Sequence, residues 1–475
     1  MPFDVISYSL AKKGISLTEG AKKKPPAFYS AIVLKDGTTV WAEDSDGKTI
    51  ASGEAGVDDA GVIQSAVDAV VSLGGGRILL KRGLYTLTDS IKLTAPIILA
   101  GEGENTILKM ADNIGEIPVI SIESNNIIIR ELLIDGNKDN RPAPSSSPSA
   151  ACGILAHWEN EAVEDVRIIN VYVKNAPYDG ININGKRVVH INCIVENSGD
   201  DGFNSQGGEE HIYIACVARN NDDDGFHLSW GERGKVISCT SYNNGQHGFY
   251  TQHDYLTIIS CRLYDNLRDG IDIASGSKYT RISFNEASNN AGNGITIEGD
   301  YAIVEGNIAY DNGTAGIYVS GEGVKIFQNI IRNTAEGYTQ DYAIDVVSSA
   351  NKAVIKENDV TNGGSIANLK IDSANSLVRN NIGQNMKTVT ADYSMIWADE
   401  AILADASGGA ITITLPDPAA YPNYEVMIKK IDSSTNAVTV APHGTETIDG
   451  ASSLTLANQN DAVRLRSDGT NWFSF

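Results

Sequence analysis

The chain has 475 residues, and its 60 Asp and Glu outnumber its 37 Lys and Arg, which gives a formal net charge of −23. This acidity argues against a nucleic-acid partner, because binding to phosphates requires a basic surface. A hydrophobic content of 42% excludes global disorder, and 46 glycines against 13 prolines favour many short strands and turns.

The sequence lacks the usual marks of a disulfide framework, a zinc site or a membrane protein. Its five cysteines include no Cys-x-x-Cys pair. The N-terminal sequence MPFDVISYSLAKKG has no apolar core of a signal peptide. No stretch reaches the roughly 18 apolar residues that a membrane span requires. We therefore expect no membrane span, and no export through the usual secretory signal if the protein acts outside a cell.

The N-terminal part is predicted to contain a separate module followed by a helix. Residues 1–54 form the module, with the run Lys22–Lys24 and Pro25–Pro26 as a solvated linker and a hairpin in VLKDGTTVWAEDSDGKTI. Residues 57–73, VDDAGVIQSAVDAVVSL, carry apolar side chains at helical spacing, and three glycines follow them. We expect one amphipathic helix, with apolar strands after it.

A repeat between residues 150 and 385 is the strongest signal in the sequence. A glycine followed by a large apolar residue recurs every 22 to 24 residues, at Gly180, Gly202, Gly225, Gly248, Gly270, Gly294 and Gly316. The LxxLxL pattern of a leucine-rich repeat is absent, and the units are too short for propeller blades. The period predicts an all-β fold, a right-handed parallel β-helix with three strands per coil.

A column of cysteines supports this interpretation. Each of the residues Cys193, Cys216, Cys239 and Cys261 lies nine positions before its repeat glycine, and the column continues as Asn285, Asn307 and Asn329. Asn side chains in an interior turn can form hydrogen bonds from coil to coil, and Cys is a small buried substitute. We therefore expect structural, reduced thiols rather than metal ligands or redox centres.

Residues 387–475 have a different residue pattern from the repeats. Segments such as AITITLP, YEVMIKKI and AVTVAP alternate apolar and polar residues, which predicts a small antiparallel β domain. The segment has no cluster of His, Cys or paired acids, so a structural or oligomerisation role is expected.

The repeat also places side chains on one face of the coils. The second residue after each glycine is expected to point outward, and this column reads Asn182, Asn204, His227, Tyr250, Asp272, Thr296 and Tyr318. The fourth residue after each glycine follows the same rule. Amides and aromatic rings suit a polysaccharide, which offers hydroxyls and apolar ring faces. The predicted substrate-binding residues are Asn182, Asn204, Gln206, Trp230, Arg233, Gln252, Arg268 and Glu298.

Two groups of residues on this face are candidates for catalysis. His227, Tyr250 and Asp272 lie on successive coils, and a His–Tyr pair can act as base and acid on opposite sides of C5 of a uronate. Arg233 or Arg268 would neutralise the uronate carboxylate.

The second group is acidic and contains Asp200–Asp201, Asp223–Asp224 and His247. Paired carboxylates suit glycoside hydrolysis. Aspartates in Asp-Gly turns are often purely structural, with local hydrogen bonds to the backbone. The doubled acids are alternatively a Ca²⁺ site, since Ca²⁺ prefers oxygen ligands. No cofactor is required by either reaction, and no other metal site is predicted.

Several segments resemble known families. DDAGVIQSAVDAV with GGGRILL and IILAGEGENT resembles the opening of the pectate-lyase-like β-helix superfamily, in which such a helix caps the first coil. With the repeats, this resemblance implies a β-helix domain over residues 55–386. The core IDGNKDN and the style of the repeats resemble the catalytic module of alginate C5-epimerases. That family's Tyr-Gly-Phe-Asp-Pro-His motif is replaced here by YDGININ, with Asn182 and Asn184 where an Asp and a His are expected. The strings GDDGFN and QHGF are partly similar to polygalacturonases.

The two ends of the chain resemble phage proteins. ASGGAITITLP with TIDGASSLTL is similar to a domain at the ends of phage tail fibres and spikes, and FDVISYSLAKK is similar to the start of tail and baseplate proteins. These resemblances imply a homotrimeric tail-spike in the virion tail. The N-terminal module would contact tail or baseplate proteins, and the C-terminal domain would serve trimerisation or tip recognition.

The sequence thus predicts a tail-spike that binds, and by lyase, hydrolase or epimerase-like chemistry cleaves or modifies, a bacterial surface polysaccharide. A non-catalytic adhesin is the main alternative. A carbohydrate-modifying enzyme, intracellular or secreted, with a borrowed phage domain is a third.

Overall fold

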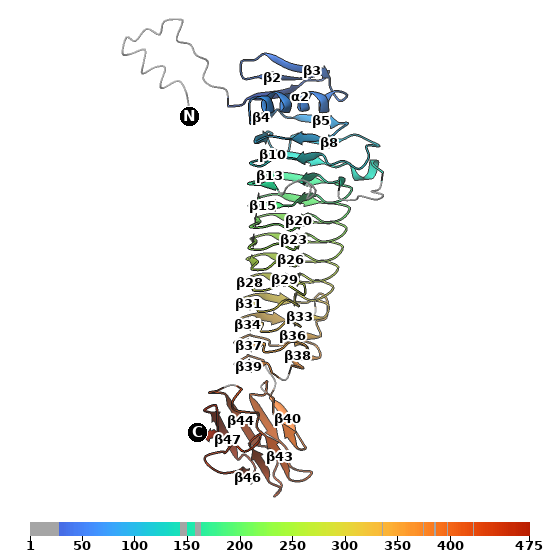
Figure 1. Cartoon of the computed structure of the whole chain (residues 1–475). Helices are drawn as coiled ribbons and strands as arrows, with labels where there is room; N and C mark the ends of the chain where they lie inside the picture. The colour runs from blue at the N-terminus through green and yellow to red at the C-terminus, as the bar shows by residue number, and fades with distance from the viewer. Residues whose placement is uncertain are drawn as a thin grey trace, which may run out of the picture.

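The computed structural model describes residues 28–142, 150–156, 163–334, 336–373, 375–383, 386–396, 398–420 and 422–475. Figure 1 shows a long stack of coils followed by a smaller unit of two sheets. The lysine run at 22–24 and the phage-like opening segment lie outside the described residues. No helix of the described residues is long and apolar enough to cross a membrane.

The first strands of the described chain pack directly on the coils. Strands β1 (Ala31–Lys35), β2 (Thr39–Asp44) and β3 (Thr49–Glu54) pair antiparallel, which confirms the predicted hairpin. Strand β1 also pairs in parallel with β4 (Gly76–Leu80), and its buried residues share the core of the coils. Residues 28–54 are therefore continuous with the solenoid, while an attachment role for residues 1–54 stays a prediction.

Helix α2 (Asp59–Ser72) is the predicted amphipathic helix, and it covers the first coil (Figure 1). Its apolar face, including Ile63 and Val67, is fully buried in the common core. The buried Asp59 carboxylate accepts hydrogen bonds from Lys35 Nζ at 2.5 Å and from the Thr86 N–H at 2.7 Å. These bonds attach the helix to β1 and to β5 (Gly83–Leu87).

Each regular coil contributes three short parallel strands, as predicted. The first ladder is a 12-stranded sheet that carries the predicted site. Its strands are β6 (Ile91–Leu93), β9 (Ile120–Ile122), β11 (Ile154–Ala156), β14 (Ile181–Ile183), β18 (Phe203–Gln206), β21 (Phe226–Ser229), β24 (Phe249–Thr251), β27 (Ile271–Ile273), β30 (Ile295–Ile297), β33 (Ala315–Val319), β36 (Tyr342–Val346) and β38 (Ala367–Ile371).

The other two ladders run side by side and form one large sheet with β1–β3. The second ladder contains β4, β7 (Ile97–Ala100), β10 (Ile128–Asp135), β13 (Arg167–Lys174), β16 (Val189–Ile191), β19 (Ile212–Ile214), β22 (Lys235–Ile237), β25 (Thr257–Ile259), β28 (Arg281–Ser283), β31 (Ile303–Glu305), β34 (Lys325–Phe327), β37 (Val354–Lys356) and β39 (Leu377–Arg379). The third contains β5, β8 (Thr106–Met110), β17 (Ile194–Glu196), β20 (Val217–Arg219), β23 (Thr240–Tyr242), β26 (Arg262–Tyr264), β29 (Glu286–Ser288), β32 (Ile308–Tyr310) and β35 (Ile330–Arg332). The long strands β10 and β13 belong to both ladders, β12 (Val163–Glu164) pairs with β15 (Gly185–Lys186), and one 3₁₀ turn spans Lys138–Asn140.

The repeat glycines are explained by the close approach of neighbouring coils. A Cβ added at Gly202 would lie 2.6 Å from the carbonyl oxygen of Gly225, and one at Gly225 would lie 2.7 Å from that of Gly248. These separations are too short for any side chain. The glycine column therefore marks where the backbone enters the first ladder, and this geometry fixes the register of the residues that follow.

The predicted interior ladder of cysteines and asparagines is confirmed. The four cysteines are buried and free, and the Cys216 N–H lies 3.4 Å from Cys239 Sγ. From Cys261 onward each backbone N–H donates to the Asn Oδ1 of the next coil, as at Asn285 and Asn307 at 2.9 Å. The column extends beyond the prediction to Asn358 and Asn381. These bonds satisfy buried donors that would otherwise destabilise the coil.

The C-terminal unit has its own hydrophobic core and two small sheets. One contains β40 (Lys387–Val389), β42 (Ala401–Ala404), β44 (Glu425–Lys430), β47 (Ala462–Ser467) and β48 (Trp472–Ser474), and the other β41 (Tyr393–Ser394), β43 (Ile411–Thr414), β45 (Val438–Ala441) and β46 (Leu454–Leu456).

The expectation of an antiparallel C-terminal domain is only partly correct. Strands β40, β42 and β44 pair in parallel, as do β41, β43 and β45, while the antiparallel pairs are β44–β47, β47–β48 and β45–β46. The chain alternates between the two sheets from β40 to β45, so successive strands of one sheet run the same way. Apolar–polar alternation is the same for both directions, so the sequence pattern could not separate them.

Candidate active site

The structure confirms the predicted column of side chains two positions after each glycine. In the parallel register Asn182 pairs with Asn204, Asn204 with His227, His227 with Tyr250, and Tyr250 with Asp272. These residues lie on β14, β18, β21, β24 and β27 of the first ladder. One residue per coil therefore reaches the same face at the spacing of adjacent strands.

The first two amides of this column are not exposed, contrary to the prediction. Asn182 and Asn204 are 5% and 4% exposed. Each amide donates to the aspartate at the start of its own coil: Asn182 Nδ2 to Asp179 Oδ2 at 2.7 Å, and Asn204 Nδ2 to Asp201 Oδ2 at 2.9 Å. These local bonds hold the amides against the turn, so their geometry favours a structural role over contact with a ligand.

The aspartates before the glycines form a second ladder. The backbone N–H of Asp201 donates to Asp179 Oδ1 at 3.2 Å, that of Asp224 to Asp201 Oδ1 at 3.0 Å, and that of His247 to Asp224 Oδ1 at 2.8 Å. One oxygen of each carboxylate therefore connects two coils, and the other faces the side chain three positions on. These hydrogen bonds give the aspartates of the Asp-Gly turns a structural role. Two of them, Asp201 and Asp224, are also predicted catalytic residues.

An open cleft of about 430 Å³ lies over coils 206–268. Eight of the predicted site residues line it: Gln206, Asp224, His227, Trp230, His247, Tyr250, Gln252 and Arg268. The remaining lining residues are Asp223, Ser229 and Gln246. The predicted residues Asn182, Asn204, Asp201, Asp272, Arg233 and Glu298 do not line it. The cleft has the size of small-ligand sites in proteins.

The two predicted catalytic groups form one cluster rather than two alternatives. His227 Nδ1, from the first group, lies 3.1 Å from Asp224 Oδ2 and 3.5 Å from Asp201 Oδ2, both from the second. His247 Nε2 lies 3.8 Å from Asp272 Oδ2. The two groups meet because the residue before each repeat glycine contacts the residue three positions further on, as Asp224 contacts His227.

The Tyr250 ring lies close to both histidines. Its ring centroid lies 4.8 Å from that of His227 and 5.9 Å from that of His247, and its hydroxyl accepts a hydrogen bond from Gln252 Nε2 at 3.1 Å. A sugar ring between two side chains needs a carbon contact of about 3.5–4 Å on each side. These ring distances favour action from one face of a sugar, and the placement of His and Tyr on opposite faces stays a prediction.

Burial sets the protonation states in this cluster. It lowers the pKa of His247 below its usual value, so this imidazole is neutral at pH 7. Burial and the nearby carboxylates of Asp269 and Glu298 raise the pKa of Asp272 to about 8, and burial and Asp224 raise that of Asp223 to about 6. Burial also raises the pKa of Tyr250, so its hydroxyl keeps its proton. At pH 7 the cluster thus combines a neutral histidine with the protonated acids Asp272 and Tyr250, while Asp223 is mostly ionised.

The structure distinguishes the two predicted arginines. Arg233 contacts three glutamates, with its guanidinium 2.8 Å from Glu232, 3.5 Å from Glu210 and 3.6 Å from Glu209. Arg268 lines the cleft, and no side chain of the described residues forms a hydrogen bond or ion pair with its guanidinium. Of these two arginines, Arg268 is therefore the one available to a ligand.

In the described part of the chain, three groups of acids and histidines are close enough to hold a cation: Asp179 with Asp200 and Asp201, Asp201 with Asp224 and His227, and His247 with Asp269 and Asp272. The first group offers only oxygen ligands, which suits Ca²⁺ best. The Oδ1 atoms of Asp179 and Asp201 already accept backbone N–H groups, which leaves few free ligands. Ca²⁺ binding stays a prediction.

Comparison with known proteins agrees with this architecture. A family model described as the right-handed β-helix region matches residues 152–309. The chain carries a right-handed β-helix. Mannuronan C5-epimerase AlgE3 of Azotobacter vinelandii is 32% identical over 108 residues, which is 20% of this chain and 6% of that protein. Alginate lyase 7 of the same organism is 35% identical over 105 residues, which is 19% of this chain and 12% of that protein.

Solved structures extend the likeness along the solenoid. The match to the A-module of A. vinelandii mannuronan C5-epimerase AlgE4 covers 68% of this chain and 96% of that module, with a TM-score of 0.58 at 20% sequence identity. The match to the N-terminal fragment of bacteriophage phi29 gene product 12 covers 76% of this chain and 79% of that fragment, with a TM-score of 0.56 at 12% sequence identity. The match to the Dettilon tailspike protein covers 85% of this chain and 74% of that protein, with a TM-score of 0.50 at 15% sequence identity. The fold predicted from the sequence is confirmed, and these identities show the fold alone.

Proposed function

We propose that this chain is a tail-spike-type protein that binds a bacterial surface polysaccharide and cleaves it in the cleft at Tyr250. The observation that carries the proposal is the open cleft that joins an unpaired arginine, two histidines, a tyrosine and an exposed tryptophan on one face of a β-helix. Support also comes from the names of similar proteins, which include a mannuronan C5-epimerase, an alginate lyase and a tailspike protein. Assembly as a homotrimer in a virion tail, attached through residues 1–54, belongs to the same proposal.

The chemistry that the cluster supports best is β-elimination on a uronate. Arg268 would bind the sugar carboxylate through two parallel N–H donors, which makes the C5 proton more acidic. Neutral His247 would take that proton on Nδ1, which would give up the hydrogen bond that it accepts from the backbone N–H of Asp269 at 3.3 Å. The C4–O bond would break as the C4=C5 double bond forms, and the Tyr250 hydroxyl would donate its proton to the leaving oxygen. Base and acid would act on one face of the sugar, which the short ring distances favour.

The remaining polar side chains have positioning roles in this proposal. His227 is held by Asp224 and packs on the Tyr250 ring, which fixes the direction of the tyrosine hydroxyl together with Gln252. Trp230, 72% exposed at the end of β21, offers a ring face to a neighbouring sugar. A protonated Asp272 keeps a further negative charge away from an anionic substrate.

The test is turnover on a panel of bacterial capsular and uronate polysaccharides, followed by the ultraviolet absorbance of unsaturated uronates and by reducing ends. We expect both signals from the unaltered protein, and a loss of at least about a hundredfold in His247→Gln and Tyr250→Phe. Tyr318→Phe is the matched control, because Tyr318 lies in the same column outside the cleft. Equal loss in the control would contradict the assignment.

Glycoside hydrolysis is the second candidate, and the raised pKa of Asp223 favours it. A carboxyl with a pKa of about 6 in the cleft can serve as a general acid. Hydrolysis would release reducing ends without ultraviolet absorbance, and Asp223→Asn would abolish it while His247→Gln would not. Substitution of His227 and Asp201 cannot separate the two mechanisms, since these side chains contact each other. Binding of a glycan without any release of fragments would show that the protein is a non-catalytic adhesin.

A further inference from the structure

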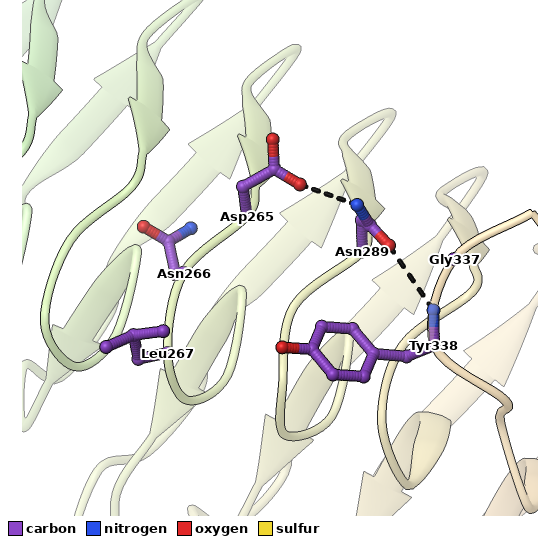
Figure 2. Close-up of a pocket in the computed structure, with 6 residues that line it drawn as sticks. All are labelled: Asp265, Asn266, Leu267, Asn289, Gly337 and Tyr338. Carbon is purple, nitrogen blue, oxygen red and sulfur yellow. Dashed lines mark hydrogen bonds between the residues drawn. The ribbon is translucent and has the colours of Figure 1, made fainter.

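A second pocket lies beside the cleft, on the other side of one turn. It has a volume of about 370 Å³ and is lined by Asp265, Asn266, Leu267, Asn289, Gly337 and Tyr338 (Figure 2). Leu267 lines this pocket, and the next residue, Arg268, lines the cleft. The two cavities therefore share the turn between β26 and β27 as a common rim.

An insertion in one coil builds this pocket. Asn307 and Asn329 of the interior ladder are 22 residues apart, whereas Asn329 and Asn358 are 29 apart. Part of the longer coil folds back over its predecessors, where the Tyr338 N–H donates to Asn289 Oδ1 at 3.3 Å and the Thr334 N–H to Asp311 Oδ1 at 2.5 Å. These bonds hold Gly337 and Tyr338 over the turns of the earlier coils.

The walls of the pocket combine apolar surface with hydrogen-bond acceptors. Figure 2 shows the Tyr338 ring extending across the coil of Asn289, with its hydroxyl directed toward the coil of Leu267. Tyr338 is 44% exposed and Leu267 is 65% exposed. Asp265 Oδ1 accepts a hydrogen bond from Asn289 Nδ2 at 2.6 Å, while Oδ2 has no hydrogen-bond partner among the described residues. A ring face next to a free carboxylate oxygen matches a sugar, which has apolar C–H faces and hydroxyl donors.

The charge of the pocket selects among sugars. Its six lining residues include one carboxylate and no Lys or Arg. A uronate would therefore meet Asp265 without a neutralising cation, whereas a neutral sugar could donate hydroxyls to it. This is the opposite of the cleft, where Arg268 is available to an anion.

We infer that the pocket at Tyr338 binds a neutral sugar, carried as a side branch by the polysaccharide whose backbone lies in the cleft. The inference rests on the proposed function for the identity of the polymer, but not for the binding of the neutral sugar itself. It assigns the substrate class: a branched glycan with acidic residues in the backbone and neutral ones in the branch. The branch would pass over the Leu267–Arg268 turn.

The test measures binding of monosaccharides to the full chain by saturation-transfer NMR. The probes are glucose, galactose, mannose and N-acetylglucosamine, with glucuronate as the anionic comparison. We expect at least one neutral sugar to bind. Asp265→Asn keeps the acceptor for Asn289 but loses the charge, and should weaken that binding about tenfold. Tyr338→Ala should weaken it by about three- to tenfold. Tyr301→Ala is the control, because Tyr301 is an exposed tyrosine outside the pocket.

Binding of no neutral sugar, or binding that persists unchanged in both Asp265→Asn and Tyr338→Ala, would overturn the inference. Tyr338→Phe, which keeps the ring, guards against a loss of binding caused by a disordered loop. The outcome is separate from that of the proposed function: His247→Gln should abolish turnover and leave monosaccharide binding intact. A protein that binds neutral sugars at Tyr338 but cleaves no polymer would support the pocket and contradict the enzyme.

Discussion

Replacement of Asn307 by alanine tests the energetic role of the interior ladder. Asn307 is fully buried, and its side chain makes four hydrogen bonds. Its Oδ1 accepts from the backbone N–H and from Nδ2 of Asn285 at 2.9 and 3.0 Å, and its Nδ2 donates to Ile282 O and Asn329 Oδ1, both at 2.9 Å. A typical hydrogen bond contributes about 1 kcal/mol net, so Asn307→Ala should lower the free energy of unfolding by about 4 kcal/mol.

The measurement is chemical denaturation followed by circular dichroism, with hydrogen exchange at the Asn285 amide as the local readout. Gln328→Ala is the matched control: it lies next to the ladder residue Asn329, is exposed, and loses one contact of 3.5 Å. It should change stability by less than about 0.5 kcal/mol. Asn307→Cys should be milder than Asn307→Ala, since Cys239 Sγ receives a backbone N–H in the same column. A loss below about 1 kcal/mol in Asn307→Ala would refute the reasoning.

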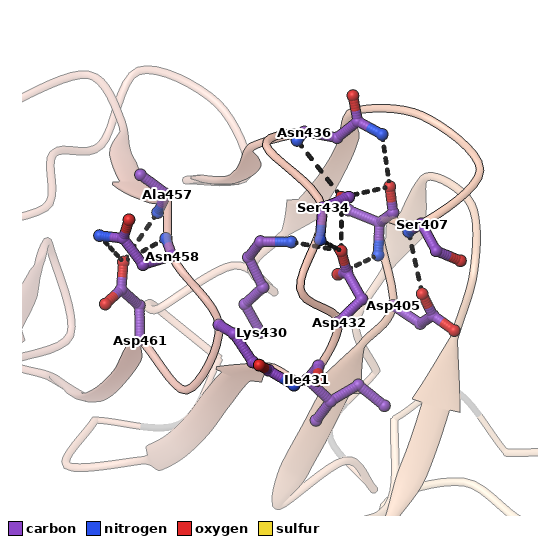
Figure 3. Close-up of polar contacts among 12 residues, drawn as sticks. Asp405, Ser407, Lys430, Ile431, Asp432, Ser434, Asn436, Ala457, Asn458 and Asp461 are labelled. Atoms are coloured by element: carbon purple, nitrogen blue, oxygen red, sulfur yellow. Dashed lines mark hydrogen bonds and ion pairs between the residues drawn. The ribbon is translucent and has the colours of Figure 1, made fainter.

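Three further predictions concern charge. Arg268→Ala should lower kcat/KM on a uronate polymer by about ten- to a hundredfold. Arg233→Ala removes a guanidinium that glutamates already bind, so it should leave turnover unchanged. Similar losses in both variants would contradict the assignment of Arg268. The folded state raises the pKa of Asp272 to about 8, so it retains a proton that the unfolded chain releases, and this group's contribution to stability falls as the pH rises from about 4 to about 8. Asp272→Asn should therefore raise the melting temperature more at pH 8 than at pH 5, and the reverse order would show that the carboxyl is ionised. In the C-terminal unit, fully buried Lys430 donates to Asp432 at 2.6 Å (Figure 3), and Lys430 and Ser434 lower the pKa of that aspartate. Asp432→Asn should lower the melting temperature of this unit at pH 7, and the difference from the unaltered protein should shrink as the pH falls below the usual aspartate range; no change at pH 7 would show that Lys430 does not depend on this partner.

The repeating architecture could be predicted from the amino-acid sequence alone. The period of 22 to 24 residues equals the length of one coil, so each column of equivalent residues could be read directly from the spacing of the glycines. This is why the order His227, Tyr250, Asp272 and the ladder from Cys193 to Asn329 were predicted correctly. In a solenoid each coil contacts only its neighbours, so local register is enough to place a side chain on a face.

Which of those side chains are free to act became clear only from their three-dimensional contacts. Asn182 and Asn204 share a column with Tyr250, yet they are buried against aspartates of their own turns, which spacing along a strand does not reveal. Arg233 and Arg268 looked equivalent in the sequence, and the glutamates around Arg233 distinguish them. The mixed direction of the C-terminal strands and the pocket under Tyr338 likewise depend on how segments far apart in the chain meet. Hydrogen bonding and burial depend on such three-dimensional neighbours, whereas the sequence period reports only the backbone path that brings them there.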